Sequence, residues 1–134
     1  MILFTTDLLF GSKILGAAKY AGLRGQGVRN RASLAQHAAG ASHFFLDLEA
    51  ELAEGESAEE LLDAALGHSH LRVFAFAGHL QADKLRAAQR RLAAAPAAGG
   101  AHEVHSRGSL NARLVEILPP AAPPVAATPA KEPT

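Results

Sequence analysis

The sequence predicts an α/β protein with a five-stranded parallel sheet and helices on both faces. Three observations support this class: short apolar runs, segments with apolar residues at helical spacing, and the regular alternation of the two along the chain. Strands that alternate with helices at this spacing indicate βα units, which form parallel sheets covered by helices on both sides.

Five segments are expected to be strands. They are residues 1–5, 23–29, 43–48, 71–77 and 101–105. The second is the weakest because Gly25 and Gly27 interrupt it. The fifth is short. The third and fourth are clear apolar runs.

Five segments between and after the strands are expected to be helices. They are residues 11–21, 30–37, 57–66, 81–95 and 109–118. Gly22 is a typical stop for the first, and Asn30 and Ser109 are typical caps for the second and fifth. Ser57 with Glu60 forms a capping box at the start of the third. Pro96 ends the fourth. Right-handed crossovers between five such units favour the flavodoxin-like strand order 2-1-3-4-5.

Length and composition limit the domain organisation and the function classes. The 134 residues fit one domain, expected over residues 1–118, and residues 119–134 hold six of the seven prolines and are expected to be a disordered tail. With no cysteine, thiol catalysis and cysteine-based zinc sites are excluded. The zero net charge gives no support for a nucleic-acid partner, and no apolar run is long enough to span a membrane. A cytoplasmic protein is therefore expected.

Two aspartates come at the ends of apolar runs, Asp7 after the first and Asp47 at the end of the third. The strand order 2-1-3-4-5 makes these two strands neighbours, and ligands of open α/β sheets bind at the carboxyl edge. The sequence therefore predicts a small acidic pocket there. Residues 41–67 carry eight acids and no Lys or Arg, which indicates either a solvated acidic face or a field that favours cations near Asp47.

Over residues 1–118 the chain resembles the receiver domain of bacterial response regulators. The resemblance is carried by the five βα units, by Thr6-Asp7 after the first strand and by Phe44-Phe-Leu-Asp47-Leu at the end of the third. It implies that Asp47 is a phosphoacceptor served by a histidine kinase. It also implies a weak Mg²⁺ site formed by Asp7, Asp47 and the backbone carbonyl of Glu49, and Mg²⁺ does prefer hard oxygen ligands.

The chain departs from the family pattern at three positions. Thr6 stands where the family has a second acid, and Ala77 stands where the family has a hydroxyl residue after strand four. The fifth strand is followed by Ser106 and Arg107 in place of a Lys followed by Pro. An arginine fork is not equivalent to a lysine ammonium group. These departures indicate a divergent receiver or a pseudo-receiver.

The other motifs give weaker evidence of function. Three arginines, Arg86, Arg90 and Arg91, lie on the expected fourth helix, either as a solvated face or as a docking face for a protein partner. The seven histidines lack the spacing of a zinc site.

Three functions stay open on the sequence. The first is a stand-alone receiver-like signalling module that contacts a histidine kinase or a signalling output protein, with or without phosphorylation of Asp47. The second is a phosphorylation-independent adaptor. The third is a small flavodoxin-like enzyme or ligand binder that uses the same sheet edge. The first is preferred, and an enzyme is not expected.

Overall fold

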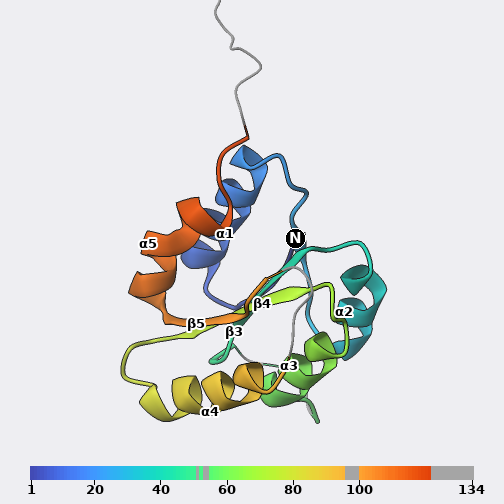
Figure 1. Cartoon of the computed structure of the whole chain (residues 1–134), viewed down its shortest axis with the longest axis vertical. Helices are drawn as coiled ribbons and strands as arrows, with labels where there is room; N and C mark the ends of the chain where they lie inside the picture. The colour runs from blue at the N-terminus through green and yellow to red at the C-terminus, as the bar shows by residue number, and fades with distance from the viewer. Residues whose placement is uncertain (51, 53–54, 96–99, 122–134) are drawn as a thin grey trace, which may run out of the picture.

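A five-stranded parallel sheet lies between two layers of helices (Figure 1). The computed structural model describes residues 1–50, 52, 55–95 and 100–121. The strands are β1 (Ile2–Phe4), β2 (Gln26–Gly27), β3 (His43–Asp47), β4 (Arg72–Ala77) and β5 (Glu103–Ser106). Their order is β2-β1-β3-β4-β5 and every neighbouring pair is parallel, so the predicted fold class and strand order are confirmed.

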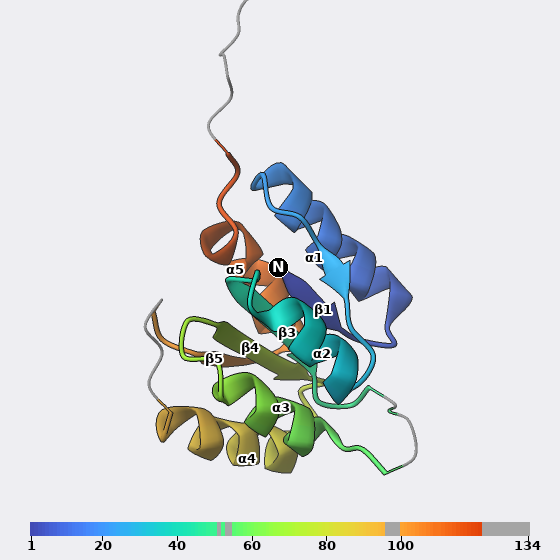
Figure 2. The ribbon, with the colours of Figure 1, turned by 90° about the vertical axis from the view of Figure 1, so that its right-hand side faces the viewer.

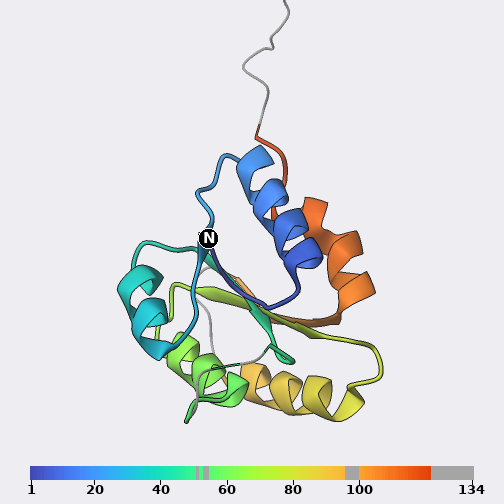
Figure 3. The ribbon, with the colours of Figure 1, turned by 180° about the vertical axis from the view of Figure 1, so that it is seen from behind.

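The helices divide between the two faces of the sheet, as Figures 2 and 3 show from two sides. One face carries α1 (Leu8–Tyr20) and α5 (Arg107–Ile117), and the other carries α2 (Arg31–Ala38), α3 (Ala58–Leu66) and α4 (Ala82–Ala93). The predicted arrangement of helices on both faces is therefore present.

The strands are apolar throughout because both of their faces are covered. In β3, Phe44 and Leu46 belong to the core beneath α2, α3 and α4, whereas Phe45 belongs to the core beneath α1 and α5. Phe74 and Phe76 of β4 join Phe45, and all five side chains are fully buried. Each large apolar side chain buried in this way contributes about 1.5–3 kcal/mol.

The first helix begins earlier than the sequence analysis expected. It starts at Leu8 and not at Gly11, because Asp7 serves as its N-cap. The Asp7 Oδ1 atom accepts a hydrogen bond from the backbone N–H of Phe10 at 3.0 Å. This satisfies one of the N–H groups that a helix start leaves without an intrahelical partner.

The cap expected for the last helix is also wrong. Ser106, not Ser109, caps α5, and the backbone N–H of Ser109 donates to the Ser106 hydroxyl at 3.2 Å. The helix therefore starts at Arg107, which places this side chain at the carboxyl edge of the sheet.

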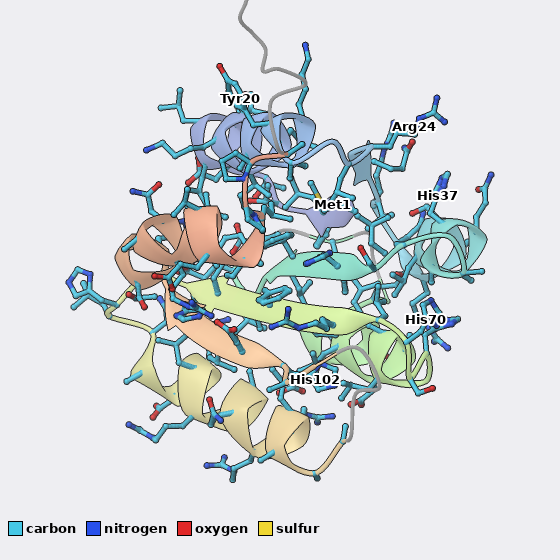
Figure 4. All side chains as sticks on the ribbon, turned by 45° about the horizontal axis from the view of Figure 1, so that its top comes forward. Met1, Tyr20, Arg24, His37, His70 and His102 are labelled. Carbon is cyan, nitrogen blue, oxygen red and sulfur yellow. The ribbon has the colours of Figure 1, made fainter. Side chains whose placement is uncertain are left out.

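The two ends of the described chain are held against the body. The amino group of Met1 donates to the carbonyl of Arg24 at 2.9 Å (Figure 4), and the N–H of Ala121 donates to the carbonyl of Tyr20 at 2.9 Å. Residues 122–134, most of the expected tail, lie outside the described residues, as do Glu51 and Glu54 of the acidic loop. In the parts that are described, no helix is long and apolar enough to cross a membrane.

Candidate functional site

Polar groups from the ends of four strands and from the segments that follow them meet at the carboxyl edge of the sheet. The strands are β1, β3, β4 and β5, and β5 leads directly into α5. The groups that meet there come from Thr5, Asp7, Asp47, Glu49, Gly78 and Arg107. Because β1 and β3 are neighbours and β4 and β5 follow them in the sheet, residues distant in sequence become contacts.

Asp47 is the buried centre of this cluster, with a side chain only 1% exposed. Its Oδ1 atom accepts the backbone N–H of Glu49 at 2.9 Å. Its Oδ2 atom accepts the Thr5 hydroxyl at 2.7 Å and Nη2 of Arg107 at 3.0 Å. Both carboxylate oxygens are therefore engaged, which is what a buried charge requires.

Arg107 contacts three carboxylates with one guanidinium group. Nη1 donates to Glu49 Oε1 at 2.7 Å, and Nη2 donates to Asp47 Oδ2 at 3.0 Å. Nε lies 3.2 Å from Asp7 Oδ2, an ion-pair distance without the alignment of a hydrogen bond. The guanidinium also lies over the ring of Phe76, with Cζ 5.6 Å from the centroid, in a cation–π arrangement.

Together, the nearby carboxylates raise the pKa of Arg107 by more than burial lowers it. Burial alone would lower the pKa of Arg107, but the hydrogen bond with Glu49 and the charges of Asp47, Glu49 and Asp7 raise it above its ordinary value. Arg107 is therefore a permanent cation at this edge.

Glu49 takes part through its side chain, which the sequence analysis did not foresee. Its Oε1 atom accepts the backbone N–H of Gly78 at 2.7 Å as well as Nη1 of Arg107. The hydrogen bond from Arg107, followed by that from Gly78, lowers the pKa of the Glu49 carboxyl. The side chain thus joins the loop after β3 to the loop after β4 and to the start of α5.

The sequence analysis also did not identify Thr5 as a residue of the site. Its hydroxyl donates to Asp47 and accepts the backbone N–H of Asp7 at 3.0 Å, so it connects the two aspartates. Thr6, at the position where the family has its second acid, is exposed. The signal that could have identified Thr5 is its place directly after β1, the strand that pairs with β3.

Two of the three residues expected at the switch positions of the family, Ala77 and Ser106, have structural contacts. Ala77 is fully buried at the end of β4, where it pairs with Ser106 of β5. The Ser106 hydroxyl caps α5. The Ser106 hydroxyl, next to the cluster, is therefore engaged in capping the first turn of α5.

The three arginines of α4 do not form one free face. Arg91 binds both carboxylate oxygens of Asp63 on α3, at 2.5 and 2.6 Å. Arg86 pairs with Asp83 one turn away. Arg86 and Arg90 are exposed on the outer side of α4.

The cluster does not fit a Mg²⁺ ion as it is folded. Carboxylate oxygens are the right donors for this ion, but the guanidinium of Arg107 lies among Asp7, Asp47 and Glu49. Among the described residues, no group of three or more His, Asp or Glu side chains is arranged to hold a metal ion.

A separate pocket of about 340 Å³ lies beside the cluster. Its walls come from the loop after β3 and from α3 and α4, with Leu48, Leu62 and Ala88 as apolar surface and Lys84 and Arg91 as cations. Of the clustered residues it includes only Glu49. Asp47 is not among its lining residues.

Among known proteins, several solved structures share this architecture. No protein-family model and no curated protein matches the sequence. Among solved structures, the signal receiver domain of a protein from Vibrio parahaemolyticus matches with a TM-score of 0.60 and 15% identity, over 87% of each chain. A CheY-like response regulator receiver domain protein from Methanospirillum hungatei matches with a TM-score of 0.60 and 10% identity, over 87% of this chain and 90% of that one.

A third similar structure is that of a response regulator protein from Burkholderia pseudomallei, with a phosphorylated aspartic acid, a calcium ion and citrate. It matches with a TM-score of 0.58 and 12% identity, over 87% of this chain and 68% of that one. Identities this low establish a shared fold and not a shared chemistry. The chain therefore has the fold of response regulator receiver domains, as its sequence resemblance predicted, and the low identities fit a divergent example.

Proposed function

We propose that this protein is a signalling module with a receiver fold that acts by binding a protein partner, without phosphorylation of Asp47. One observation carries the proposal: the Asp47 side chain is 1% exposed and both of its oxygens are already bound, by Thr5, Arg107 and the backbone of Glu49. Of the functions left open by the sequence, the phosphorylation-independent adaptor agrees best with this arrangement.

The contacts of Asp47 work against phosphoryl transfer. A carboxylate that attacks phosphorus needs an accessible oxygen, and it needs a cation that neutralises the incoming phosphoryl oxygens. Here the cation nearest to Asp47 is Arg107, which also binds Glu49 and lies beside Asp7. Ala77 offers no hydroxyl for a phosphoryl group at the end of β4.

The partner in this proposal is a signalling output protein or a histidine kinase in the cytoplasm. The surface we assign to it is the outer side of α4, where Arg86 and Arg90 are exposed. The proposal excludes Arg91 from this surface, because its guanidinium is bound to Asp63. It includes no catalytic role, no nucleic acid and no membrane.

Intact mass spectrometry tests the proposal. The protein is incubated with Mg²⁺ and acetyl phosphate, and the variant Asp47→Ala is treated in parallel. We expect no phosphoryl adduct on either protein. An acid-stable, base-labile adduct on the wild type that is lost in Asp47→Ala would instead support the phosphorylated signalling module.

A further inference from the structure

We propose that the open edge of the sheet at β2 binds an extended, acidic segment of a partner protein, which pairs with β2 and inserts one apolar side chain between β2 and α1. This place is distinct from the outer side of α4, because β2 is one edge strand of the sheet and α4 packs against β4 and β5 at the other edge. With both surfaces the protein can hold two partners at once. Binding at β2 does not depend on the α4 surface.

The strand β2 has backbone groups available for pairing. Within the described residues its only neighbour in the sheet is β1. The N–H groups of Gln26 and Val28 donate to the carbonyls of Met1 and Leu3, both at 2.9 Å. Gly27 lies between them, so its N–H and C=O point away from β1, and the exposed carbonyl accepts a hydrogen bond from the Gln26 side chain at 3.0 Å. An extended segment of another protein can pair with such an edge by β-strand addition.

A groove of about 450 Å³ lies between β2 and α1, which are next to each other in Figure 2. Two glycines on the same side of the strand explain it. A Cβ atom on Gly25 would lie 2.6 Å from Cδ2 of Leu15, so a side chain there would displace this leucine of α1. Side chains alternate along a strand, so Gly27 faces the same way, and a Cβ atom there would meet nothing within 4 Å. The groove is the space over Gly27.

The wall of the groove on the α1 side is apolar. It is formed by Leu8 and Leu15, whose exposed fractions are 83% and 39%. An apolar side chain placed over Gly27 would cover both leucines, and removing this surface from water favours binding. Side chains of an extended segment point alternately to its two faces, so one of them can enter the groove while the backbone pairs with β2.

Two arginines flank β2 and determine the charge of a suitable partner. Arg24 and Arg29 are exposed, and the Arg24 side chain extends away from the body of the protein (Figure 4). Among the described residues neither forms an ion pair. Residues 1–40 carry five Lys or Arg and one acid, Asp7, which lines the groove but pairs with Arg107. An acidic segment therefore complements this edge.

The same features disfavour two other occupants. A second copy that paired β2 with β2 would bring the arginines of both copies together, and charged flanks are a common protection of edge strands against such pairing. An anionic lipid surface would attract the arginines, but it offers no extended backbone to pair with Gly27. An acidic protein segment satisfies both the backbone and the charges.

A nuclear magnetic resonance titration of the full chain tests the proposal. The probe is a short synthetic peptide in which glutamate and valine alternate, and the control peptide has lysine in place of each glutamate. We expect the amide signals of Gly25 and Gly27 to shift most on addition of the glutamate peptide. This peptide should bind about tenfold more tightly than the lysine peptide, or better.

Two variants separate recognition from folding. Gly27→Val fills the groove, and the backbone at Gly27 is not in the left-handed region, so the thermal midpoint should not fall while the affinity for the glutamate peptide drops about tenfold. Arg29→Glu reverses one flanking charge and keeps the backbone N–H that donates to Ser33, and we expect a similar loss of affinity. The control Arg90→Glu makes the same reversal on α4 and should leave the affinity unchanged.

Several results would overturn the proposal. They are no binding of the glutamate peptide, equal binding of both peptides, or full affinity in Gly27→Val. Shifts of the Gly25 and Gly27 signals with protein concentration alone would assign the edge to a second copy. Shifts caused by anionic vesicles and not by the peptide would assign it to a lipid surface, and either result would replace the acidic protein segment as the occupant.

Discussion

Two arginine-centred clusters in this molecule have similar numbers of ion pairs but different surroundings. Arg107 meets Asp7, Asp47 and Glu49 at the carboxyl edge, where Asp47 is only 1% exposed. Arg91 meets Asp63 and Glu59 between α3 and α4, where the two acids are 57% and 64% exposed.

From this difference we expect burial, and not the number of ion pairs, to decide the energetic role of each cluster. Exposed pairs gain little because water screens them and their side chains lose rotamer freedom. A buried carboxylate is costly to leave without a partner, because no water replaces the lost contacts. We therefore expect the fold to depend on Arg107 and to tolerate changes at Arg91.

The largest expected effect comes from Arg107→Ala. It should lower the free energy of unfolding by about 3 kcal/mol, since it leaves the buried charge of Asp47 without its cation. Urea denaturation without divalent cations measures this change. Arg91→Ala is the matched control on the exposed cluster and should have a much smaller effect, so equal losses from the two variants would remove the distinction between the clusters.

A smaller effect is expected from Thr5→Val, which replaces the hydroxyl by a methyl group of similar size. The Asp47 Oδ2 atom then loses its shortest hydrogen bond, 2.7 Å in the wild type. We expect a loss of about 1–2 kcal/mol, which thermal denaturation detects. Thr6→Val, at an exposed neighbouring position, should change the stability little; if it destabilised the protein as much as Thr5→Val, the hydrogen bond to Asp47 would not be the cause.

The smallest of these effects depends on pH and concerns Glu49. Its pKa is lowered in the folded protein, first by the hydrogen bond from Arg107. Its stabilising contribution is therefore complete above the unfolded pKa of about 4.3 and is lost as the pH falls through the lower folded value. The stability difference between the wild type and Glu49→Gln, measured by urea denaturation, should shrink between pH 6 and pH 3. A difference that grows on acidification would show that the pKa is not lowered.

Much of the fold could be predicted because its signals are local. Apolar runs and cap residues gave the five βα units, and the crossover rule gave the strand order. Helix starts were less accurate, because Asp7 ends one apolar run and caps the next helix, and either Ser106 or Ser109 is a typical cap. For α5 the two serines have similar local preferences as caps, and for α1 the interpretation of Asp7 as a strand end left out its role as a cap.

The candidate site was only partly predictable for a related reason. Asp47 follows from its place at the end of a strand, but the contacts of Arg107 depend on where α5 begins, which was expected two residues later. Glu49 was assigned its backbone carbonyl through the resemblance, whereas its side chain makes the contacts seen here. The Arg107 side chain reaches Glu49 and Asp47, which are 58 and 60 residues away in the sequence, and no periodicity in the sequence specifies such contacts.

The pairing of Arg107 with Asp47 is the central claim of this account, and a double-mutant cycle measures it directly. The free energies of unfolding of the wild type, Arg107→Ala, Asp47→Asn and the double variant give the coupling between the two side chains. We expect a coupling of about 2 kcal/mol or more, because the pair is close and Asp47 is buried. A coupling below about 0.5 kcal/mol would show that Arg107 does not hold Asp47, and the account would be wrong.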